Sequence, residues 1–210
     1  MGLTTTTRVI LAAGRGSRMQ GETKALLDFQ GQTALALLAA LTLPSPCRTI
    51  VVGGYDAAAV AAEAERHGLG FVENLDWEQG QTTSLQCGLR AASADVSTDT
   101  LVLHPVDLPL VTQEDYDAVS AAYDVSPSDE VGRRVAATSI GMRRGHPIFF
   151  SAAVARELLD LEASGSARSV FGRHQDLIAH AIVSNEWVRR DLDHPEDYAA
   201  ALAAFSARSN

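Results

Sequence analysis

Residues 11 to 27, LAAGRGSRMQGETKALL, combine a glycine-rich turn with two separated cations. The turn follows the apolar run RVIL, and its small residues AAGRG let the backbone approach a ligand closely. Successive N–H groups in such a turn can bind an anion. Arg18 offers a fork that matches a phosphate and Lys24 offers a movable point charge, so together they suit a triphosphate. The stretch lacks the Gly-Lys-Ser/Thr of a P-loop, and a solvated surface turn is the competing interpretation.

Three aspartates are candidate metal ligands. Asp107 in LVLHPVDLPLV ends an apolar run and lies between two prolines, so its carboxylate is carried on a stiffened loop. Mg²⁺ binds through one or two carboxylates together with phosphate oxygens, and Asp107 is either such a ligand or an ordinary turn residue. In RRDLDHPEDY, alternation along a strand would place Asp191 and Asp193 on one face. One of these two aspartates is a candidate for the second metal ligand. The alternative is that the aspartate only caps the helix that follows.

A third polar segment occurs in ENLDWEQGQTTSLQCGL. Gly80 is followed by amide and hydroxyl side chains up to Ser84, at the expected start of a helix. Free N–H groups and small hydroxyls there suit a phosphate or the edge of a base. A plain capped helix is an equally good interpretation of this segment alone.

These motifs are carried by alternating elements. Short β-branched runs alternate with longer Ala/Leu-rich stretches four times: RVILAA with TALALLAALTL, RTIVVGG with DAAAVAAEAERHG, LGFVEN with TTSLQCGLRAA, and TLVLHPVD with QEDYDAVSAAYD. Four β-then-α units predict an α/β protein whose parallel sheet is covered by helices on both faces. Such sheets bind ligands beyond the carboxyl ends of their strands, which is where the glycine-rich turn and Asp107 fall.

The second half of the chain departs from this alternation. Residues 126–145 contain Pro, Gly and paired Arg and predict a mobile insertion or a hairpin. HPIFFSAAVARELLDLEAS predicts a strand and a helix, HAIVSNEWVRRDLD a further strand, and PEDYAAALAAFSAR a terminal helix with Pro195 in its first turn. We find no linker or internal repeat, so one domain over residues 1–210 is expected.

Composition narrows the class of protein. The chain has 210 residues and a net charge of −9, without a basic cluster that could bind nucleic acid. Its longest apolar run is far shorter than the ~20 residues that span a bilayer, so no membrane segment is expected. Cys47 and Cys87 are too few for a disulfide framework and lie among apolar residues, which predicts buried, reduced thiols and a cytoplasmic location.

Taken in order, five elements resemble the MobA/MocA-like nucleotidyltransferases. They are LAAGRGSRM with KALL, NLDWEQGQTTSLQCGL, VDLP, RGHPIFF and DLDHPEDY. Five ordered elements over nearly the whole chain are far more specific than any one of them. The resemblance implies an α/β, Rossmann-like three-layer fold with a mostly parallel central sheet and helices on both faces, in one nucleotidyltransferase domain.

The resemblance also implies a reaction. RGHPIFF and DLDHPEDY look most like the branch that attaches CMP to molybdopterin cofactor, and LAAG in place of LAGG points away from the guanylyltransferase branch. The implied activity is Mg²⁺-dependent transfer of CMP from CTP to the phosphate of molybdopterin cofactor, releasing pyrophosphate, with a downstream molybdoenzyme or its chaperone as protein partner. The alternatives are a transferase that uses GTP or another nucleotide with a different phosphorylated acceptor, and a non-catalytic nucleotide-binding relative.

The same resemblance assigns roles to individual residues. Arg18 and Lys24 would bind and stabilise the triphosphate, and Asp107 and Asp193 would hold Mg²⁺. The nucleotide would be wrapped by the first turn and its base contacted by the third segment, through Leu11, Ala12, Ala13, Gly14, Arg15, Gly16, Gly80 and Ser84.

The motifs implied for the acceptor side of the site depart from the family pattern. His146 in RGHPIFF and Arg168 in ASGSARSVF would bind the acceptor, with His146 near the pterin phosphate. The family's Gly-Asp-x-Gly-Ala-Arg element has lost its acid here, and the glycine expected directly after Met19 is displaced by Gln20. These departures concern the acceptor and the Arg-to-Lys loop more than the nucleotide chemistry.

Overall fold

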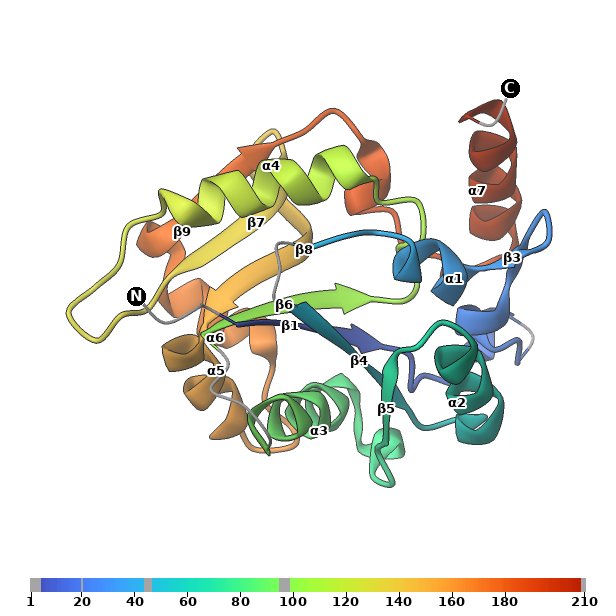
Figure 1. Cartoon of the computed structure of the whole chain (residues 1–210), viewed down its shortest axis with the longest axis horizontal. Coiled ribbons are helices and arrows are strands. Elements are labelled where there is room, and N and C mark those ends of the chain that lie inside the picture. The colour runs from blue at the N-terminus through green and yellow to red at the C-terminus, as the bar shows by residue number, and fades with distance from the viewer. Residues whose placement is uncertain (1–4, 20, 44–46, 95–98, 209–210) are drawn as a thin grey trace.

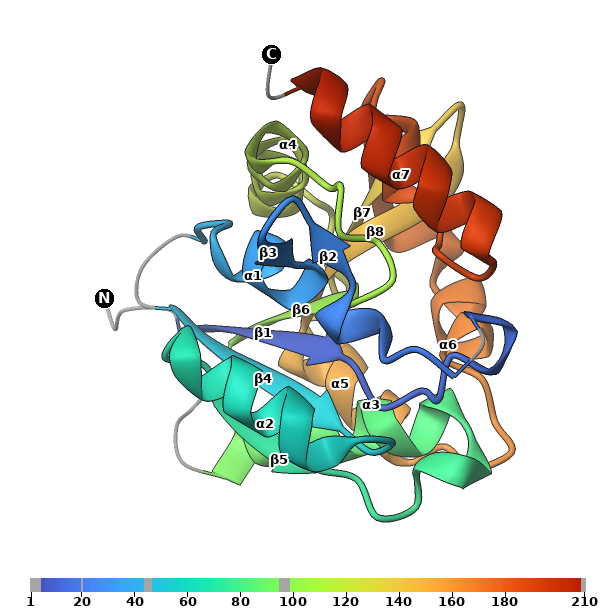
Figure 2. The ribbon, with the colours of Figure 1, turned by 90° about the vertical axis from the view of Figure 1, so that its right-hand side faces the viewer.

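The computed structural model describes residues 5–19, 21–43, 47–94 and 99–208. Gln20, the residue that displaces the family glycine, lies outside the described residues. A seven-stranded sheet runs through the middle of the molecule, with helices packed on both of its faces (Figures 1 and 2).

The sheet has the order β5-β4-β1-β6-β8-β7-β9. Neighbouring strands are parallel except where β8 is involved, since it runs antiparallel to both β6 and β7. The carboxyl ends of β1, β4 and β6 therefore share one edge of the sheet with the beginning of β8. The strands are β1 (Thr6–Leu11), β4 (Cys47–Gly53), β5 (Gly70–Glu73), β6 (Thr100–Pro105), β7 (Val135–Ile140), β8 (Arg143–Ser151) and β9 (Ile178–Ile182).

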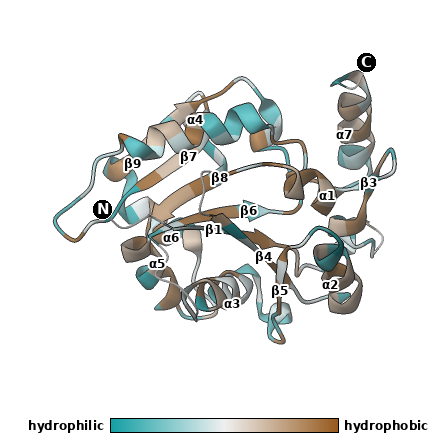
Figure 3. Ribbon diagram, in the orientation of Figure 1, coloured by the Kyte–Doolittle hydropathy of each residue, from teal (hydrophilic) through white to brown (hydrophobic). Residues whose placement is uncertain are grey.

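Alternation along the strands produces the two helical layers. In β1, Val9 and Leu11 pack with the helices of one face, whereas Ile10 packs with those of the other. The first layer contains α3 (Gln81–Ala94), α5 (Ala152–Leu159) and α6 (Ala167–Arg173), and the second contains α1 (Ala34–Ala39), α2 (Ala57–Arg66) and α4 (Gln113–Asp124). Figure 3 shows mostly apolar strands in the centre and a largely hydrophilic α4 outside them. The predicted three-layer α/β fold is confirmed.

The second half differs from the prediction at helix α6, which was not predicted, and at the predicted last strand. Residues 126–145 include the turn of the antiparallel hairpin β7–β8, so the hairpin interpretation is confirmed. The predicted last strand, however, is confined to β9. The chain then forms the 3₁₀ turn η5 (Glu186–Val188), capped by the Asn185 side chain and buried at Trp187, so the aspartates that follow do not lie on a strand. The terminal helix α7 (Pro195–Arg208) begins at the predicted proline.

The two cysteines are not both buried. Cys47 is exposed at the first residue of β4, where the core layer ends, and Cys87 is half-buried on α3, so the prediction of two buried thiols is wrong. Both are free cysteines. Among the described residues, no helix is long and apolar enough to cross a membrane.

Gly88 on α3 packs directly against the sheet. A Cβ atom built there would lie 2.4 Å from a Val9 methyl and 2.8 Å from a Val52 methyl. We expect Gly88→Ala to lower the free energy of unfolding by about 1 kcal/mol, because overpacking (~1–3 kcal/mol) outweighs the gain in helix propensity (up to ~1 kcal/mol). Urea denaturation measures this, and Gly172→Ala in α6 is the control, since nothing lies within 4 Å of its added Cβ. Equal stability of the two variants would contradict the close packing.

Candidate active site

The glycine-rich turn leaves β1 at the shared edge of the sheet and folds back on itself. Gly16 has a φ of +59°, and a Cβ there would lie 2.5 Å from the carbonyl oxygen of Glu22, so only glycine fits this position. The Gly16 carbonyl accepts hydrogen bonds from the amides of Met19 (2.8 Å) and Gly21 (3.3 Å). Burial of Met19 anchors the turn, which leaves Arg18 in solvent at the mouth of the cleft.

Lys24 lies between two carboxylates at the bottom of this cleft. Its Nζ is 2.8 Å from Oδ1 of Asp193 and 3.2 Å from Oδ2 of Asp107, and its side chain is only 14% exposed. Arg18 approaches the other oxygen of Asp193 at 3.6 Å. The predicted cation pair and the predicted metal carboxylates are thus neighbours, although they are far apart in the sequence.

Packing of the C-terminal helix brings Lys24 and Asp193 together. Lys24 begins the 3₁₀ turn η2 (Lys24–Leu26), which leads into the small hairpin of β2 (Asp28–Phe29) and β3 (Gln32–Thr33). The Phe29 ring contacts the rings of Tyr198 and Phe205 on α7 edge to face, at 5.5 and 5.7 Å. Figure 2 shows α7 lying over this hairpin. The Leu192 amide also donates to the Asp107 carbonyl at 2.9 Å, which ties the Asp193 segment to the Asp107 loop.

Asp191 and Asp193 are separated by their contacts. Asp193 meets Lys24, whereas Asp191 is exposed and forms no hydrogen bond or ion pair with another described residue. Asp191 is near enough to Asp107 for its charge to raise the pKa of that carboxyl, after the larger effect of burial. The geometry therefore favours Asp193 as the second carboxylate of the cleft.

Lys24 and the two carboxylates shift one another's pKa values. Burial lowers the pKa of Lys24, but Asp107 and Asp193 outweigh burial, so the pKa of Lys24 is raised. The hydrogen bond from Lys24 lowers the pKa of Asp193, whereas burial leaves that of Asp107 raised. Lys24 is accordingly an ammonium at neutral pH.

The buried side chain of His104 is hydrogen-bonded to the loop that carries Asp107. His104 Nε2 donates to the Leu108 carbonyl at 3.1 Å, and because a carbonyl only accepts, Nδ1 must accept from the Tyr116 hydroxyl at 2.6 Å. Burial lowers the pKa of His104 from 6.5 to about 3, so the ring stays neutral. Its two ring nitrogens then link the Leu108 carbonyl to the Tyr116 hydroxyl.

The buried His104 predicts an acid-sensitive fold. The unfolded chain binds a proton near pH 6.5 and the folded chain only near pH 3, so stability is expected to fall as the pH drops below about 6.5. One such histidine contributes a slope of up to ~1.4 kcal/mol per pH unit. Urea denaturation at pH 7, 6 and 5 measures the slope, which should be smaller by about one proton in His104→Gln. An unchanged slope in that variant would contradict a neutral His104.

The third polar segment, which contains Gly80 and Ser84, also lines the cleft. Gly80 has a φ of +118° and precedes α3. The Asn74 side chain donates to the Thr83 hydroxyl at 2.9 Å and to the buried Ser84 hydroxyl at 3.0 Å, which fixes the first turn of that helix. Trp77 packs against Gly54, where a Cβ would lie 2.6 Å from the Trp77 Cβ.

A cleft of about 410 Å³ collects most of the predicted nucleotide and metal residues. Arg15 is the exception, because its guanidinium lies over the Tyr55 ring at 5.5 Å and does not line the cleft. Trp77 and Glu78 also line the cleft, although the sequence motifs assign neither of them a role in binding. The predicted residues that line the cleft are Leu11, Ala12, Ala13, Gly14, Gly16, Arg18, Lys24, Gly80, Ser84, Asp107 and Asp193.

His146 and Arg168 lie in an adjoining cavity of about 690 Å³. Leu11 and Gly80 line both spaces, so the cavity and the cleft adjoin each other. His146 Nδ1 lies 3.3 Å from the Leu103 carbonyl and must donate to it. Burial lowers the pKa of His146 to about 4, so its ring is neutral and Nε2 remains an acceptor.

The donor set suits a hard divalent cation. Two carboxylates already share one cation, the Lys24 ammonium, and each has a second oxygen. Among the described residues, no three His, Cys, Asp or Glu side chains converge on one point, so there is no closed protein cage. A site with two carboxylates and open positions matches Mg²⁺ bound together with phosphate oxygens.

The sheet is mostly parallel and is covered by helices on both faces. At its carboxyl edge lie a glycine-rich turn, a basic pair and two carboxylates. This combination defines a nucleotide-dependent transferase of the α/β class. The chain belongs to the family of the MobA-like NTP transferase domain, whose model matches residues 8–177. It is therefore a nucleotidyltransferase of the MobA-like family.

Two relatives and one solved structure illustrate the family. The chain is 30% identical over 199 residues to the nicotine blue oxidoreductase of Paenarthrobacter nicotinovorans, covering 90% of this chain and 93% of that one. It is also 30% identical over 197 residues to the molybdenum cofactor guanylyltransferase of Cereibacter sphaeroides, covering 92% and 93%. The fold matches that of Rv0371c from Mycobacterium tuberculosis H37Rv in complex with manganese, with a TM-score of 0.72 and 23% identity over 96% of this chain and 100% of that one.

Proposed function

We propose that this chain transfers CMP from CTP to the terminal phosphate of molybdopterin cofactor and releases pyrophosphate. The observation that carries the proposal is the position of Lys24, held between Asp107 and Asp193 in a cleft that adjoins a second cavity. The cleft has the charges that a triphosphate and its metal need, and the second cavity provides room for an acceptor.

The reaction balances without a covalent enzyme intermediate. An oxygen of the acceptor phosphate attacks the α-phosphorus of the nucleotide, the bond from that phosphorus to the α,β-bridging oxygen breaks, and pyrophosphate leaves with the electron pair. Such a step requires mainly positioning and electrostatic stabilisation. Lys24 would leave the carboxylates to bind phosphate oxygens, and Arg18 would neutralise the leaving pyrophosphate at the mouth of the cleft.

Asp107 and Asp193 are the residues that would hold Mg²⁺. When bound, the ion would offset the negative charge of the phosphates. The manganese in the Rv0371c structure supports a divalent metal in this fold. His104 would keep Asp107 in place through the Leu108 carbonyl, and α7 would do the same for Asp193.

The nucleotide would lie along the glycine-rich turn, with its base toward Gly80 and Ser84. Ser84 is buried and hydrogen-bonded to Asn74, so it would act through the shape of the helix start more than as a free hydroxyl. Arg15 would contribute through the backbone of the turn, because its side chain lies on Tyr55.

CTP is preferred over GTP on the basis of the LAAG turn and the RGHPIFF and DLDHPEDY elements. The relative from Cereibacter sphaeroides is a guanylyltransferase, so GTP is the principal competing donor. The test is incubation with molybdopterin cofactor, Mg²⁺ and CTP, GTP or ATP in turn, with pyrophosphate as the readout. Fastest release with CTP would support the proposal, and fastest release with GTP would reassign the donor. A product nucleotide would then pass to a molybdoenzyme or its chaperone.

The similarity to nicotine blue oxidoreductase supports a second candidate, an oxidoreductase acting on nicotine blue. A parallel incubation with NADH or NADPH and nicotine blue, followed by absorbance, tests it. Pyrophosphate release without nicotinamide oxidation favours the transferase, and the reverse favours the oxidoreductase. Nucleotide binding with neither reaction would indicate a non-catalytic relative.

A further inference from the structure

Strand β8 presents an arginine to the second cavity. On β7, Ala137 and Ser139 are two residues apart and share a face. They pair with Ile148 and Arg144 of β8, so Arg144 lies on the same face of the sheet as Ile148, across a register shift between the two pairs. Ile148 and Phe150 pack in the core on the α3, α5 and α6 side, and Arg144, His146 and Ile148 all line the cavity. Arg143, the preceding residue, is exposed and does not line it.

Helix α6 presents a second arginine to the same space. The Phe171 ring contacts the Phe150 ring edge to face at 5.7 Å, which places this side of α6 over β8. Arg168 is three residues before Phe171, on the same side of the helix, and both line the cavity. Arg144 and Arg168 thus approach one space from the sheet and from the helix that covers it.

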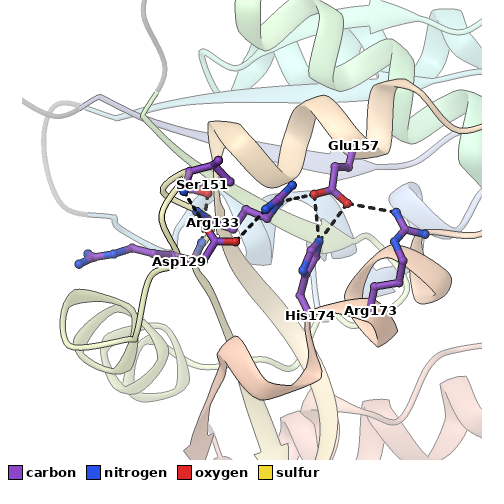
Figure 4. Close-up of polar contacts among 8 residues, drawn as sticks. Asp129, Arg133, Ser151, Glu157, Arg173 and His174 are labelled. Carbon is purple, nitrogen blue, oxygen red and sulfur yellow. Dashed lines mark hydrogen bonds and ion pairs between the residues drawn. The ribbon is translucent and has the colours of Figure 1, made fainter.

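Neighbouring cations are neutralised, but these two are not. Figure 4 shows Glu157 of α5 accepting from Arg133, Arg173 and His174, at 3.1 Å for Arg173 and 2.9 Å for His174. Contacts of this kind anchor the C-terminal end of α6. Among the ion pairs of the described residues, none involves Arg144 or Arg168, and the cavity lining that the structure describes contains no Asp or Glu.

The rest of the cavity lining is mixed: Gln79, Gln81, Thr82, Ser164 and Ser166 are polar, and apolar side chains lie among them. Leu85, Leu103, Ile148 and Phe171 contribute to its lining. His146 adds one hydrogen-bond acceptor, since its Nδ1 proton is engaged by Leu103. A neutral acceptor is a poor partner for a phosphate oxygen, so an anion in this cavity is better matched by the arginines than by His146.

We propose that Arg144 and Arg168 bind a second anionic group of the acceptor, at the end remote from the phosphate that reacts. The inference rests on the proposed transferase function, because the reacting phosphate must reach the cleft of Lys24 and Asp107. The substrate class is then an acceptor with two separated anionic groups, joined by an apolar or planar body that lies on the Leu and Phe side chains. Its body carries an N–H or O–H donor for His146 Nε2.

Steady-state kinetics provide the first test. Arg144→Ala and Arg168→Ala are each expected to raise the KM for molybdopterin cofactor about 10- to 100-fold, the range for one lost charge-assisted hydrogen bond. The kcat at saturating acceptor and the KM for the nucleotide should change little, and Arg144→Lys should recover part of the loss. Arg143→Ala, next to Arg144 on the opposite face, is the matched control and should behave as wild type. An unchanged acceptor KM in both Ala variants, with Tm values equal to wild type, would overturn the inference.

Direct anion binding provides a readout that does not depend on turnover. With the cleft filled by a non-hydrolysable CTP analogue and Mg²⁺, inorganic phosphate is titrated by calorimetry into wild type and the three Ala variants. Loss of phosphate affinity in Arg144→Ala and Arg168→Ala, but not in Arg143→Ala, supports the anion site. If the same variants lose phosphate affinity and no acceptor is turned over by wild type, the anion site stands and only the proposed function fails. Turnover with wild-type acceptor KM and phosphate binding in every variant would leave the function standing and overturn the anion site.

Discussion

Lys24→Ala is expected to lower the rate of pyrophosphate release by ~10²-fold or more at saturating nucleotide and metal, the scale for one preorganised electrostatic group. The ammonium is largely buried and 2.8 Å from Asp193, so no neighbouring side chain can substitute for it without a rearrangement. Arg66→Ala is a control, since its side chain is 72% exposed on α2 and pairs with Glu63 of the same helix. A Lys24→Ala rate close to that of wild type would contradict the catalytic role.

The same variant should bind metal more tightly when no nucleotide is present. In the free protein, Lys24 neutralises the two carboxylates that a divalent ion would use, so its removal leaves them available. Titration with Mn²⁺, followed by electron paramagnetic resonance, measures this affinity. Tighter metal binding together with slower turnover is a combination that general unfolding of the variant cannot produce.

Asp107→Asn is expected to reduce turnover by about 10²-fold and to require at least about tenfold more Mg²⁺ for half-maximal activity, since even indirect ligand partners change metal affinity by 10- to 100-fold. The amide keeps the shape of the side chain and removes its charge. Activity measured against Mg²⁺ concentration gives both values.

Asp193→Asn and Asp191→Asn complete this experiment. Asp193 shares Lys24 with Asp107 and should show a similar shift in the Mg²⁺ midpoint, whereas Asp191 is exposed and has no such contact, so its variant should shift the midpoint much less. A larger shift in Asp191→Asn than in Asp193→Asn would exchange the roles of the two residues.

Much of the cleft could be predicted from the sequence because it is made at strand ends. The turn after β1 and the Asp107 loop after β6 follow neighbouring parallel strands, and parallel strands deliver their carboxyl ends to one edge. The position of Asp193 required more information, since it depends on how α7 packs on Phe29. Strand alternation predicted one face for Asp191 and Asp193, but that segment is not a strand, and of the two only Asp193 contacts Lys24.

The acceptor side was less accessible to sequence analysis for a physical reason. Arg144 reaches the cavity only because β8 runs antiparallel to β6, and Arg168 reaches it only because Phe171 packs on Phe150. Neither the strand direction nor that packing leaves a periodic signal in the residues themselves. The exposure of Cys47 also could not be predicted from the sequence. Apolar residues lie near it in the sequence, but they do not show that the core ends before the first residue of β4.

Lys24 is also the only lysine in the chain. Its ε-amino group therefore has the N-terminal amine as its only amine competitor for reagents. Reductive methylation with ¹³C-formaldehyde would place one side-chain NMR signal inside the cleft, without any substitution elsewhere. Movement of that signal on addition of nucleotide, metal or acceptor would report the release of Lys24 from its two carboxylates, and the only other labelled group would be the N-terminal amine.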